Sequence, residues 1–200
     1  RVYQINLAIA GIAVGTVSLP VLSKAFKKKN LEKISNIQNK SFELSLLLSV
    51  PASLGLILAS EEIVNALFGY GSFSKDDVVL TSEALKYFGF GVPAFALVKI
   101  LSNFYFARDN TKTPFYISMF IVTLNIIISV SFFSKIGFII IPIATSISTW
   151  IGVLVYLYLL NLKQALLLKN HLMINFIKIL VSTIIMSLVL LLALDSYANY

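Results

Sequence analysis

The chain has 200 residues, of which 58% are hydrophobic and only 12% are charged. A soluble globular domain carries about twice that share of charged residues, so the composition excludes an ordinary soluble domain and predicts an all-α, polytopic membrane protein. The chain has no cysteine, which excludes disulfide and thiol chemistry, and its net charge of +7 is interpreted first as a signal of orientation in the membrane.

Long apolar stretches predict a bundle of six membrane-spanning helices. Each stretch comes near the roughly 17–25 residues that a spanning helix needs. A strand interpretation fails, because apolar and polar residues do not alternate and the runs are too long. The predicted spans are residues 2–23, 44–60, 87–114, 113–134, 136–162 and 170–194.

The third predicted span carries a charge, Lys99, inside an apolar stretch. An ionisable residue within a span is costly, so Lys99 is a candidate functional residue. Gly89, Gly91 and Pro93 precede it, and we expect the helix to be interrupted there, where it lines a cavity. The alternative is that Lys99 snorkels to the interface, because its stem covers part of the roughly 13 Å to Arg108.

The connections between the predicted spans alternate in charge. The first (residues 24–40), third and fifth, together with Lys178 at the start of the sixth span, hold eleven lysine and arginine residues, whereas the others and the tail hold three. The positive-inside rule therefore predicts that the odd-numbered connections face the cytoplasm. A second interpretation of the first connection is that it attracts anionic lipid headgroups.

The second connection contains local helix signals. Ser74 followed by Asp76 and Asp77 predicts an N-cap with acidic residues in the first turn. We expect this helix to continue directly into the third span. Residues 61–68 are predicted to be an amphipathic end of the second span.

Enzyme chemistry has little support in the sequence. The single histidine, His171, is predicted at an interface with no carboxylate nearby, and no His/Glu cluster has metal-ligand spacing. We therefore predict no enzyme activity, no resident cofactor and no metal centre. Asn125 and Ser129 lie one helical turn apart and are suited to supply oxygen ligands to an ion; hydrogen bonding between helices is the alternative.

Several motifs resemble those of one known family. They are G-I-A-V-G-T-V-S-L-P-V-L-S-K at residues 11–24, A-L-F-G-Y-G-S-F-S-K-D-D at 66–77, P-A-F-A-L-V-K at 93–99 and F-Y-F-A-R-D-N-T-K-T-P at 104–114. Their order and spacing resemble the MurJ/MviN lipid II flippases over nearly the whole chain. Because the chain begins with Arg1, we expect a C-terminal piece of such a protein.

The resemblance implies an architecture and a location. The family's proteins have fourteen helices and belong to a superfamily that includes multidrug antiporters and polysaccharide flippases. This chain would supply helices eight to thirteen, with residues 1–162 as five helices of the second lobe. Residues 163–200 would be one helix of the C-terminal pair that forms a lipid-tail groove. The implied location is the bacterial inner membrane.

The resemblance also implies site residues. Arg1 resembles the family's cavity arginine at the start of helix eight, which is implicated in gripping the lipid II diphosphate, and Lys99 matches a lysine common in the family. We predict both as substrate-binding residues. Asn125 and Thr145 are similar to ligands of a sodium site, with Ser129 where the family has an acidic ligand. Na+ or the membrane potential is then the expected driving force. The expected partners are lipid II (an undecaprenyl diphosphate-linked disaccharide pentapeptide) and membrane lipids, without nucleic acid.

The predicted function is transfer of lipid II from the cytoplasmic to the outer leaflet by alternating access. One alternative is a sister transporter, either a flippase for another polyprenyl-linked saccharide or a multidrug antiporter. Another is a structural membrane protein without transport, against which the charges at Arg1 and Lys99 argue. Arginines elsewhere in the cavity favour a flippase, and acidic cavity residues favour an antiporter.

Overall fold

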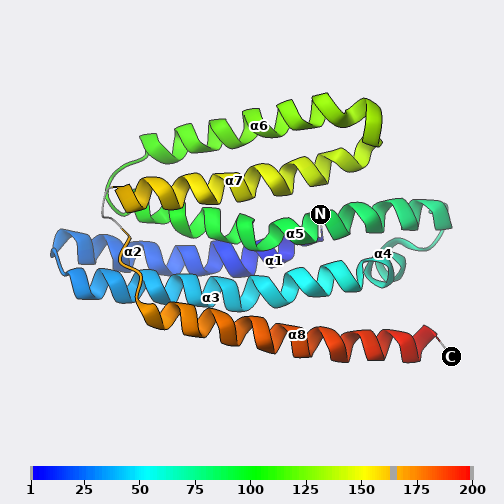
Figure 1. The fold of residues 1–200 in the computed structure, drawn as a ribbon, viewed down its shortest axis with the longest axis horizontal. Helices are drawn as coiled ribbons and strands as arrows, with labels where there is room; N and C mark the ends of the chain where they lie inside the picture. Colours follow the sequence, from blue (N-terminus) through cyan, green and yellow to red (C-terminus); the bar gives the residue numbers. More distant parts are fainter. Residues whose placement is uncertain (1, 163–165, 199–200) are drawn as a thin grey trace.

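The computed structural model describes residues 2–162 and 166–198. The described chain is helical and contains no strand. Figure 1 shows long helices lying side by side. The elements are α1 (Tyr3–Leu7), the π-helical η1 (Ala8–Ala13), α2 (Val14–Lys27), α3 (Leu31–Leu58), α4 (Ser60–Phe68), α5 (Lys75–Phe106), α6 (Lys112–Ile136), the short 3-10 helix η2 (Gly137–Ile139), α7 (Ile140–Leu162) and α8 (Asn170–Ala198).

Five helical segments of the described chain are long and apolar enough to cross a membrane, by length and composition. The longest, Lys112–Leu162, contains both α6 and α7, which fold back on each other near Gly137 (Figure 1). Gly137 has φ +76°, a left-handed conformation that glycine adopts without steric cost. The predicted all-α bundle is confirmed, whereas its division into residues 1–162 and 163–200 and its helix numbering stay predictions.

α5 is the central helix, with α3 packed along one side and α7 along the other. Figure 1 shows α6 outside α7 and α8 outside α3. Phe104 of α5 meets Phe42 of α3 with ring centroids 5.6 Å apart, and Tyr105 meets Tyr156 of α7 at 5.9 Å. All four rings are buried. These apolar contacts fix α5 between its neighbours over the half that follows Pro93.

The predicted interruption of the third span is wrong, because α5 is continuous through its glycines and proline. Pro93 has no N–H, so the carbonyl of Gly89 lacks its usual intrahelical donor. Ser53 of α3 supplies the missing donor, and its Oγ donates to that carbonyl at 2.7 Å. The helix therefore passes Pro93 without leaving a buried carbonyl unpaired.

The two glycines of this stretch permit close packing of neighbouring helices. A Cβ on Gly89 would lie 2.9 Å from Cγ1 of Ile57 on α3. A Cβ on Gly91 would lie 2.6 Å from Oγ of Ser146 on α7. Both distances are too short for ordinary contact, so these positions exclude larger side chains. The glycines thus serve the contacts of α5 with α3 and α7.

A double-mutant cycle tests this account of Pro93. Ser53→Ala is expected to lower the free energy of unfolding by about 1–3 kcal/mol, because the buried Gly89 carbonyl loses its donor. Pro93→Ala restores an N–H at position 93, so the loss should largely disappear in the double variant. Thermal unfolding in detergent measures all four proteins. An equal loss from Ser53→Ala in both backgrounds would contradict the account.

The predicted connection over residues 24–40 is mostly helical. α2 continues to Lys27 and α3 begins at Leu31. Asn30 caps α3, its side chain accepting a hydrogen bond from the N–H of Lys33 at 2.9 Å. Lys24 and Lys27 lie in α2, and Lys33 and Lys40 lie in α3, so both helices extend past the apolar stretches into the basic connection, where lysine is a good helix former. Hydropathy therefore marks the membrane boundary and not the helix boundary.

The second connection contains a separate helix and a confirmed cap. Residues 61–68, predicted as the end of the second span, belong to α4, which is distinct from α3. Oγ of Ser74 accepts a hydrogen bond from the N–H of Asp77 at 3.2 Å, and the Asp77 carboxylate accepts one from the N–H of Ser74 at 2.9 Å. α5 therefore begins in the connection and continues into the third span, as predicted.

The connection before α8 is attached to α3 by polar side chains. Ser35 Oγ and Asn39 Nδ2 donate to the carbonyl of Leu167 at 2.7 and 2.8 Å. Gln38 Oε1 accepts from the N–H of Leu167 at 3.0 Å, and Asn39 Oδ1 accepts from the N–H of Lys169 at 2.9 Å. These four bonds hold the described part of the connection against α3 and fix where α8 starts.

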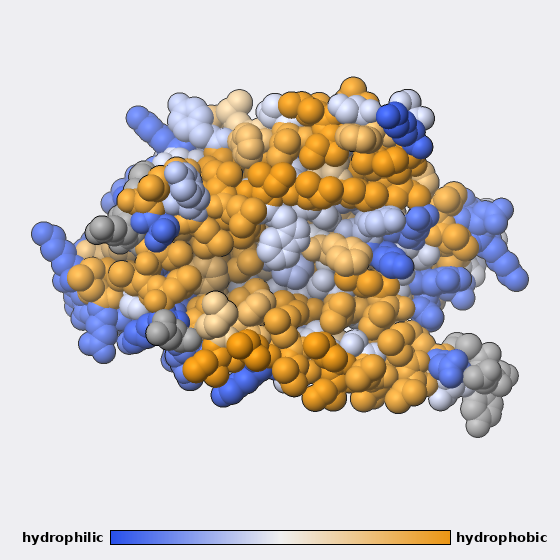
Figure 2. All heavy atoms as spheres, viewed as in Figure 1, coloured by the Kyte–Doolittle hydropathy of each residue, from blue (hydrophilic) through white to orange (hydrophobic). Residues whose placement is uncertain are grey.

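The polar and apolar surfaces of the bundle are separated along its length. Figure 2 shows hydrophobic atoms over the middle of the molecule and hydrophilic atoms at both ends. The ends of α2, α5 and α7 and the starts of α3, α6 and α8 lie at one end of the bundle (Figure 1). The three basic connections therefore meet at the same end, as the predicted topology requires.

Candidate functional site

Lys99 lies on the face of α5 that packs against α1. Tyr3 of α1 stacks on Phe88 with ring centroids 4.4 Å apart, and it also contacts Phe95 at 5.8 Å. Lys99 follows Phe95 by one helical turn, so it lies on the same face. Its side chain is exposed, and its ammonium makes no hydrogen bond or ion pair with any residue that the structure describes. The charge is thus available to an anionic ligand on that face.

Arg1, the other predicted substrate-binding residue, lies outside the described residues, so its role stays a prediction. The residue two positions later, Tyr3, is fixed to α5 through Phe88. Phe88 precedes Lys99 by eleven residues, which is roughly 16 Å along a helix. The start of α1 and Lys99 therefore lie at different levels along α5.

The sequence did not predict the π-helical segment η1, which lies between α1 and α2. π segments are rare and occur frequently at functional sites. Directly after η1, Gly15 lets α2 approach α5 closely, because a Cβ there would lie 2.5 Å from Nδ2 of Asn103. The alanines and glycines of residues 8–15 are typical of close helix packing, but they do not specify π hydrogen bonding.

The structure brings together two members of the predicted cation site. Asn125 of α6 donates from Nδ2 to Oγ1 of Thr145 on α7 at 2.9 Å. Thr145 in turn donates from Oγ1 to the carbonyl of Ile141 at 2.7 Å. Ser129 is different, because its Oγ is buried and has no hydrogen-bond partner among the described residues. The pair joins α6 to α7, and Ser129 is not part of that link.

Asn125 and Thr145 are paired without an ion in this arrangement. The Thr145 hydroxyl gives its hydrogen to Ile141, so its oxygen can only accept, and Asn125 must present its NH2 group. The amide oxygen of Asn125 then points away from the Thr145 oxygen. No cluster of three or more His, Asp or Glu side chains that could hold a metal is found in the described part of the chain. A helix-to-helix hydrogen bond explains the pair without an ion.

Arg108 occupies the basic end of the bundle, after α5. Its guanidinium carbon lies 4.5 Å from the ring centroid of Phe26 on α2, a cation–π contact. Burial lowers the pKa of Arg108 from its ordinary value, while the neighbouring Tyr105 acts in the opposite direction. A guanidinium keeps its charge through such a shift. Arg108 thus ties the end of α5 to α2.

Comparison with known proteins identifies the family. The family model described as "Lipid II flippase MurJ" matches residues 1–200. A probable lipid II flippase MurJ from Rickettsia prowazekii (strain Madrid E) is 34% identical over 201 residues, which cover 100% of this chain and 39% of the relative. One from Rhizobium meliloti (strain 1021) is 37% identical over 154 residues, which cover 77% of this chain and 29% of the relative.

A solved structure shares the fold. It is a lipid II flippase MurJ in an inward closed conformation, with a TM-score of 0.84 and 30% sequence identity. The match covers 96% of this chain and 39% of that chain, so this chain spans about two fifths of the solved structure's length. The apolar helices and the family together confirm the predicted location in the bacterial inner membrane, as a multi-pass protein. The chain belongs to the lipid II flippase MurJ family.

Proposed function

We propose that the protein containing this chain moves lipid II from the cytoplasmic to the outer leaflet of the inner membrane by alternating access, without covalent catalysis. Family membership over all 200 residues supports the reaction. Among single residues, the proposal rests on Lys99. Lys99 lies on the central apolar helix α5, and its ammonium has no partner among the described residues. A charge within a membrane-spanning helix is costly, so a helix with only a structural role gains nothing from it. A path for a diphosphate requires a cationic partner of this kind.

The physical problem in this transport is the headgroup. A diphosphate cannot enter hydrocarbon without groups that replace its water. Charge-assisted hydrogen bonds from lysine or arginine supply such partners. In the proposed mechanism Lys99 and Arg1 contact the diphosphate while the polyprenyl tail stays in the lipid. Rocking of the two lobes then changes the side of the membrane to which the cavity opens.

For the driving force we favour the membrane potential over a sodium ion at Asn125, Ser129 and Thr145. The contacts of Asn125 and Thr145 satisfy each other without a cation. A potential that is positive outside would draw an empty cationic cavity back towards the cytoplasm. The energy available is about 2.3 kcal/mol per charge for each 100 mV.

Transport from the cytoplasmic to the outer leaflet requires that the protein has a single orientation in the membrane. Cysteine labelling tests this orientation. The chain has no native cysteine, so single cysteines give an unambiguous signal. Lys28→Cys, in the turn between α2 and α3, should be labelled only from the cytoplasm. Ser72→Cys, between α4 and α5, should be labelled only from outside. The reverse pattern would contradict the positive-inside interpretation and the proposed direction of transport.

Rescue of growth tests the function itself. The full-length protein should restore growth to bacteria whose own lipid II flippase has been depleted. A protein that reaches normal membrane levels in both strains but rescues only cells lacking a flippase for another polyprenyl-linked saccharide would favour that alternative. Failure in both strains would favour a role without transport. Membrane levels are checked by immunoblotting in each strain.

A further inference from the structure

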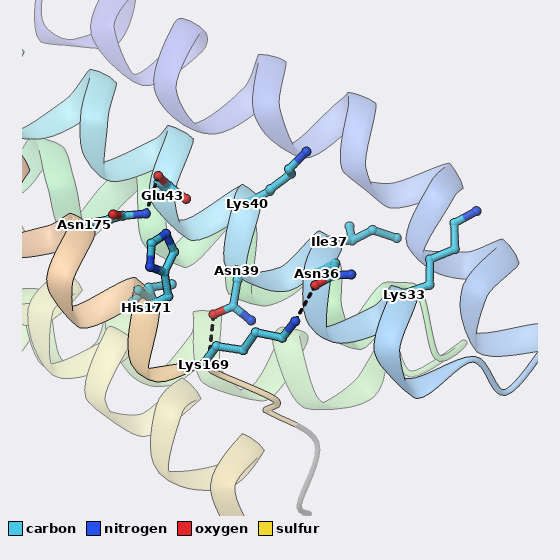
Figure 3. A pocket seen from close by; sticks show the side chains of 10 residues that line it. Lys33, Asn36, Ile37, Asn39, Lys40, Glu43, Lys169, His171 and Asn175 are labelled. Atoms are coloured by element: carbon cyan, nitrogen blue, oxygen red, sulfur yellow. Dashed lines mark hydrogen bonds between the residues drawn. The ribbon is translucent and has the colours of Figure 1, made fainter.

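A polar hollow of about 640 Å³ lies at the basic end of the bundle, between α3 and the start of α8. Figure 3 shows its lining side chains. Lys33 and Lys40 come from α3, and Lys169 and His171 come from the connection and the first turn of α8. The hollow therefore gathers cationic and titratable side chains from segments far apart in the sequence.

Positive side chains outnumber negative ones in the lining of this hollow. The one acidic side chain in its lining, Glu43, accepts a hydrogen bond from Nδ2 of Asn175 at 2.7 Å. The ammonium of Lys169 donates to Oδ1 of Asn36 at 2.7 Å and keeps two further donors. The ammonium groups of Lys33 and Lys40 make no hydrogen bond or ion pair with the residues that the structure describes. Three lysines against one engaged carboxylate favour an anionic ligand.

The wall of the hollow is held in place before any ligand arrives. Asn39, which lines the hollow, bonds to the backbone at both Leu167 and Lys169. Ser35 and Gln38 add further bonds to Leu167. A ligand would therefore not have to order the connection, which lowers the entropic cost of binding.

An apolar groove begins at the same place. Ile37 and Lys40 line both the polar hollow and a groove of about 440 Å³ between α2 and α3. The groove continues along α3 to Leu48 and is lined on the other side by residues such as Val17. Eleven residues separate Ile37 from Leu48, roughly 16 Å of helix, close to half the roughly 30 Å hydrocarbon core of a bilayer. The groove thus matches the depth of one leaflet.

We propose that the hollow and the groove together bind an anionic phospholipid of the cytoplasmic leaflet. The phosphate binds at Lys40, which Figure 3 shows extending from α3 towards the groove side, and the flexible side chain of Lys169 supplies a second cation from the other side of the hollow. One acyl chain lies in the groove beside Val17. Ile37 and Lys40 line both the hollow and the groove, so the cationic site adjoins the apolar one. A phospholipid has the same order of groups, with a charged phosphate next to apolar acyl chains. A soluble phosphate would use only the upper half. The site is separate from Lys99 and does not depend on the proposed transport of lipid II.

Lipid titration of the full-length protein in detergent tests the site. Phosphatidylglycerol should bind and raise the unfolding temperature, while phosphatidylcholine with the same acyl chains should have little effect. The Lys40→Gln/Lys169→Gln variant should bind phosphatidylglycerol about tenfold more weakly or worse, because two cations near the phosphate are lost. The matched control, Lys27→Gln/Lys28→Gln, removes two charges at the same end but outside the hollow, and its affinity should change less than about twofold.

Further arms separate the alternatives. Lys40→Arg/Lys169→Arg should retain binding. Lys40→Gln alone should also weaken binding, and because it removes no hydrogen bond of the described structure, that loss is not explained by misfolding. Val17→Phe should weaken binding of the lipid by filling the groove but leave binding of inorganic phosphate unchanged. Equal losses in the hollow variant and its control would overturn the proposal. So would inorganic phosphate binding as tightly as phosphatidylglycerol, which would indicate a soluble anion.

Discussion

Lys99→Met is expected to leave the protein at its normal level in the membrane and to slow export of lipid II by roughly ten- to a hundredfold, because a hydrogen bond to a charged group contributes about 1.5–3 kcal/mol. Methionine has a similar length but no charge, so it removes the proposed partner of the diphosphate without opening a cavity. Lys99→Arg should keep activity. Lys99→Glu should be worse than methionine, since it places a negative charge beside the diphosphate.

The control for this experiment is a second lysine on the same helix. Lys86 lies nearer the start of α5 and is also exposed. It is thirteen residues before Lys99, which places it on a different face of the helix. Lys86→Met should therefore export lipid II normally. Normal export by a normally inserted Lys99→Met protein would instead show that Lys99 snorkels to the interface.

Gly91→Leu is expected to prevent stable packing of α5 against α7. Even a Cβ at this position would lie 2.6 Å from Oγ of Ser146 and 2.7 Å from Cζ of Phe95. Ser146 also donates to the carbonyl of Tyr87 at 2.8 Å, so moving it breaks a hydrogen bond between the helices. Overpacking costs about 1–3 kcal/mol, and the buried Ser146 hydroxyl that loses its acceptor adds a similar amount. Most of the protein should aggregate during purification or unfold at a much lower temperature.

Gly55→Ala is the matched control for this steric prediction. Gly55 is also helical, but nothing lies within 4 Å of a Cβ built there. Because alanine is favoured over glycine in a helix by up to about 1 kcal/mol, Gly55→Ala should unfold at the same or a slightly higher temperature. Thermal unfolding of both variants in detergent measures the difference. Similar unfolding temperatures for Gly91→Leu and Gly55→Ala would contradict the packing described for α5.

The fold was largely predictable because a long, continuous apolar run satisfies its backbone hydrogen bonds in a bilayer by forming a spanning helix. The cap at Ser74 was predictable for a different reason, since it depends on residues three positions apart. The course of α5 through Pro93 was not, because the donor that replaces the missing N–H belongs to Ser53, forty residues earlier and on another helix. A local sequence pattern cannot show which distant hydroxyl will meet a carbonyl.

The candidate sites divide in the same way. A charge within an apolar run identifies Lys99 without any structure. The pairing of Asn125 with Thr145 required the hairpin of α6 and α7, and the resemblance to a family, not the spacing, had linked them. The polar hollow was missed because Asn36, Asn39 and Lys40 on α3 resemble an ordinary solvated face. Only the position of the connection at Leu167 and Lys169 gives that face a partner.

Outward exposure of lipid II in living cells tests the central claim most directly. Cells depleted of their own flippase receive the full-length protein that contains this chain, and lipid II accessible from outside is measured over time, with membrane levels of the protein held equal. The account predicts that export recovers with the natural protein and with Lys99→Arg but not with Lys99→Met. Absence of exported lipid II in cells that carry the natural protein at normal levels would contradict it.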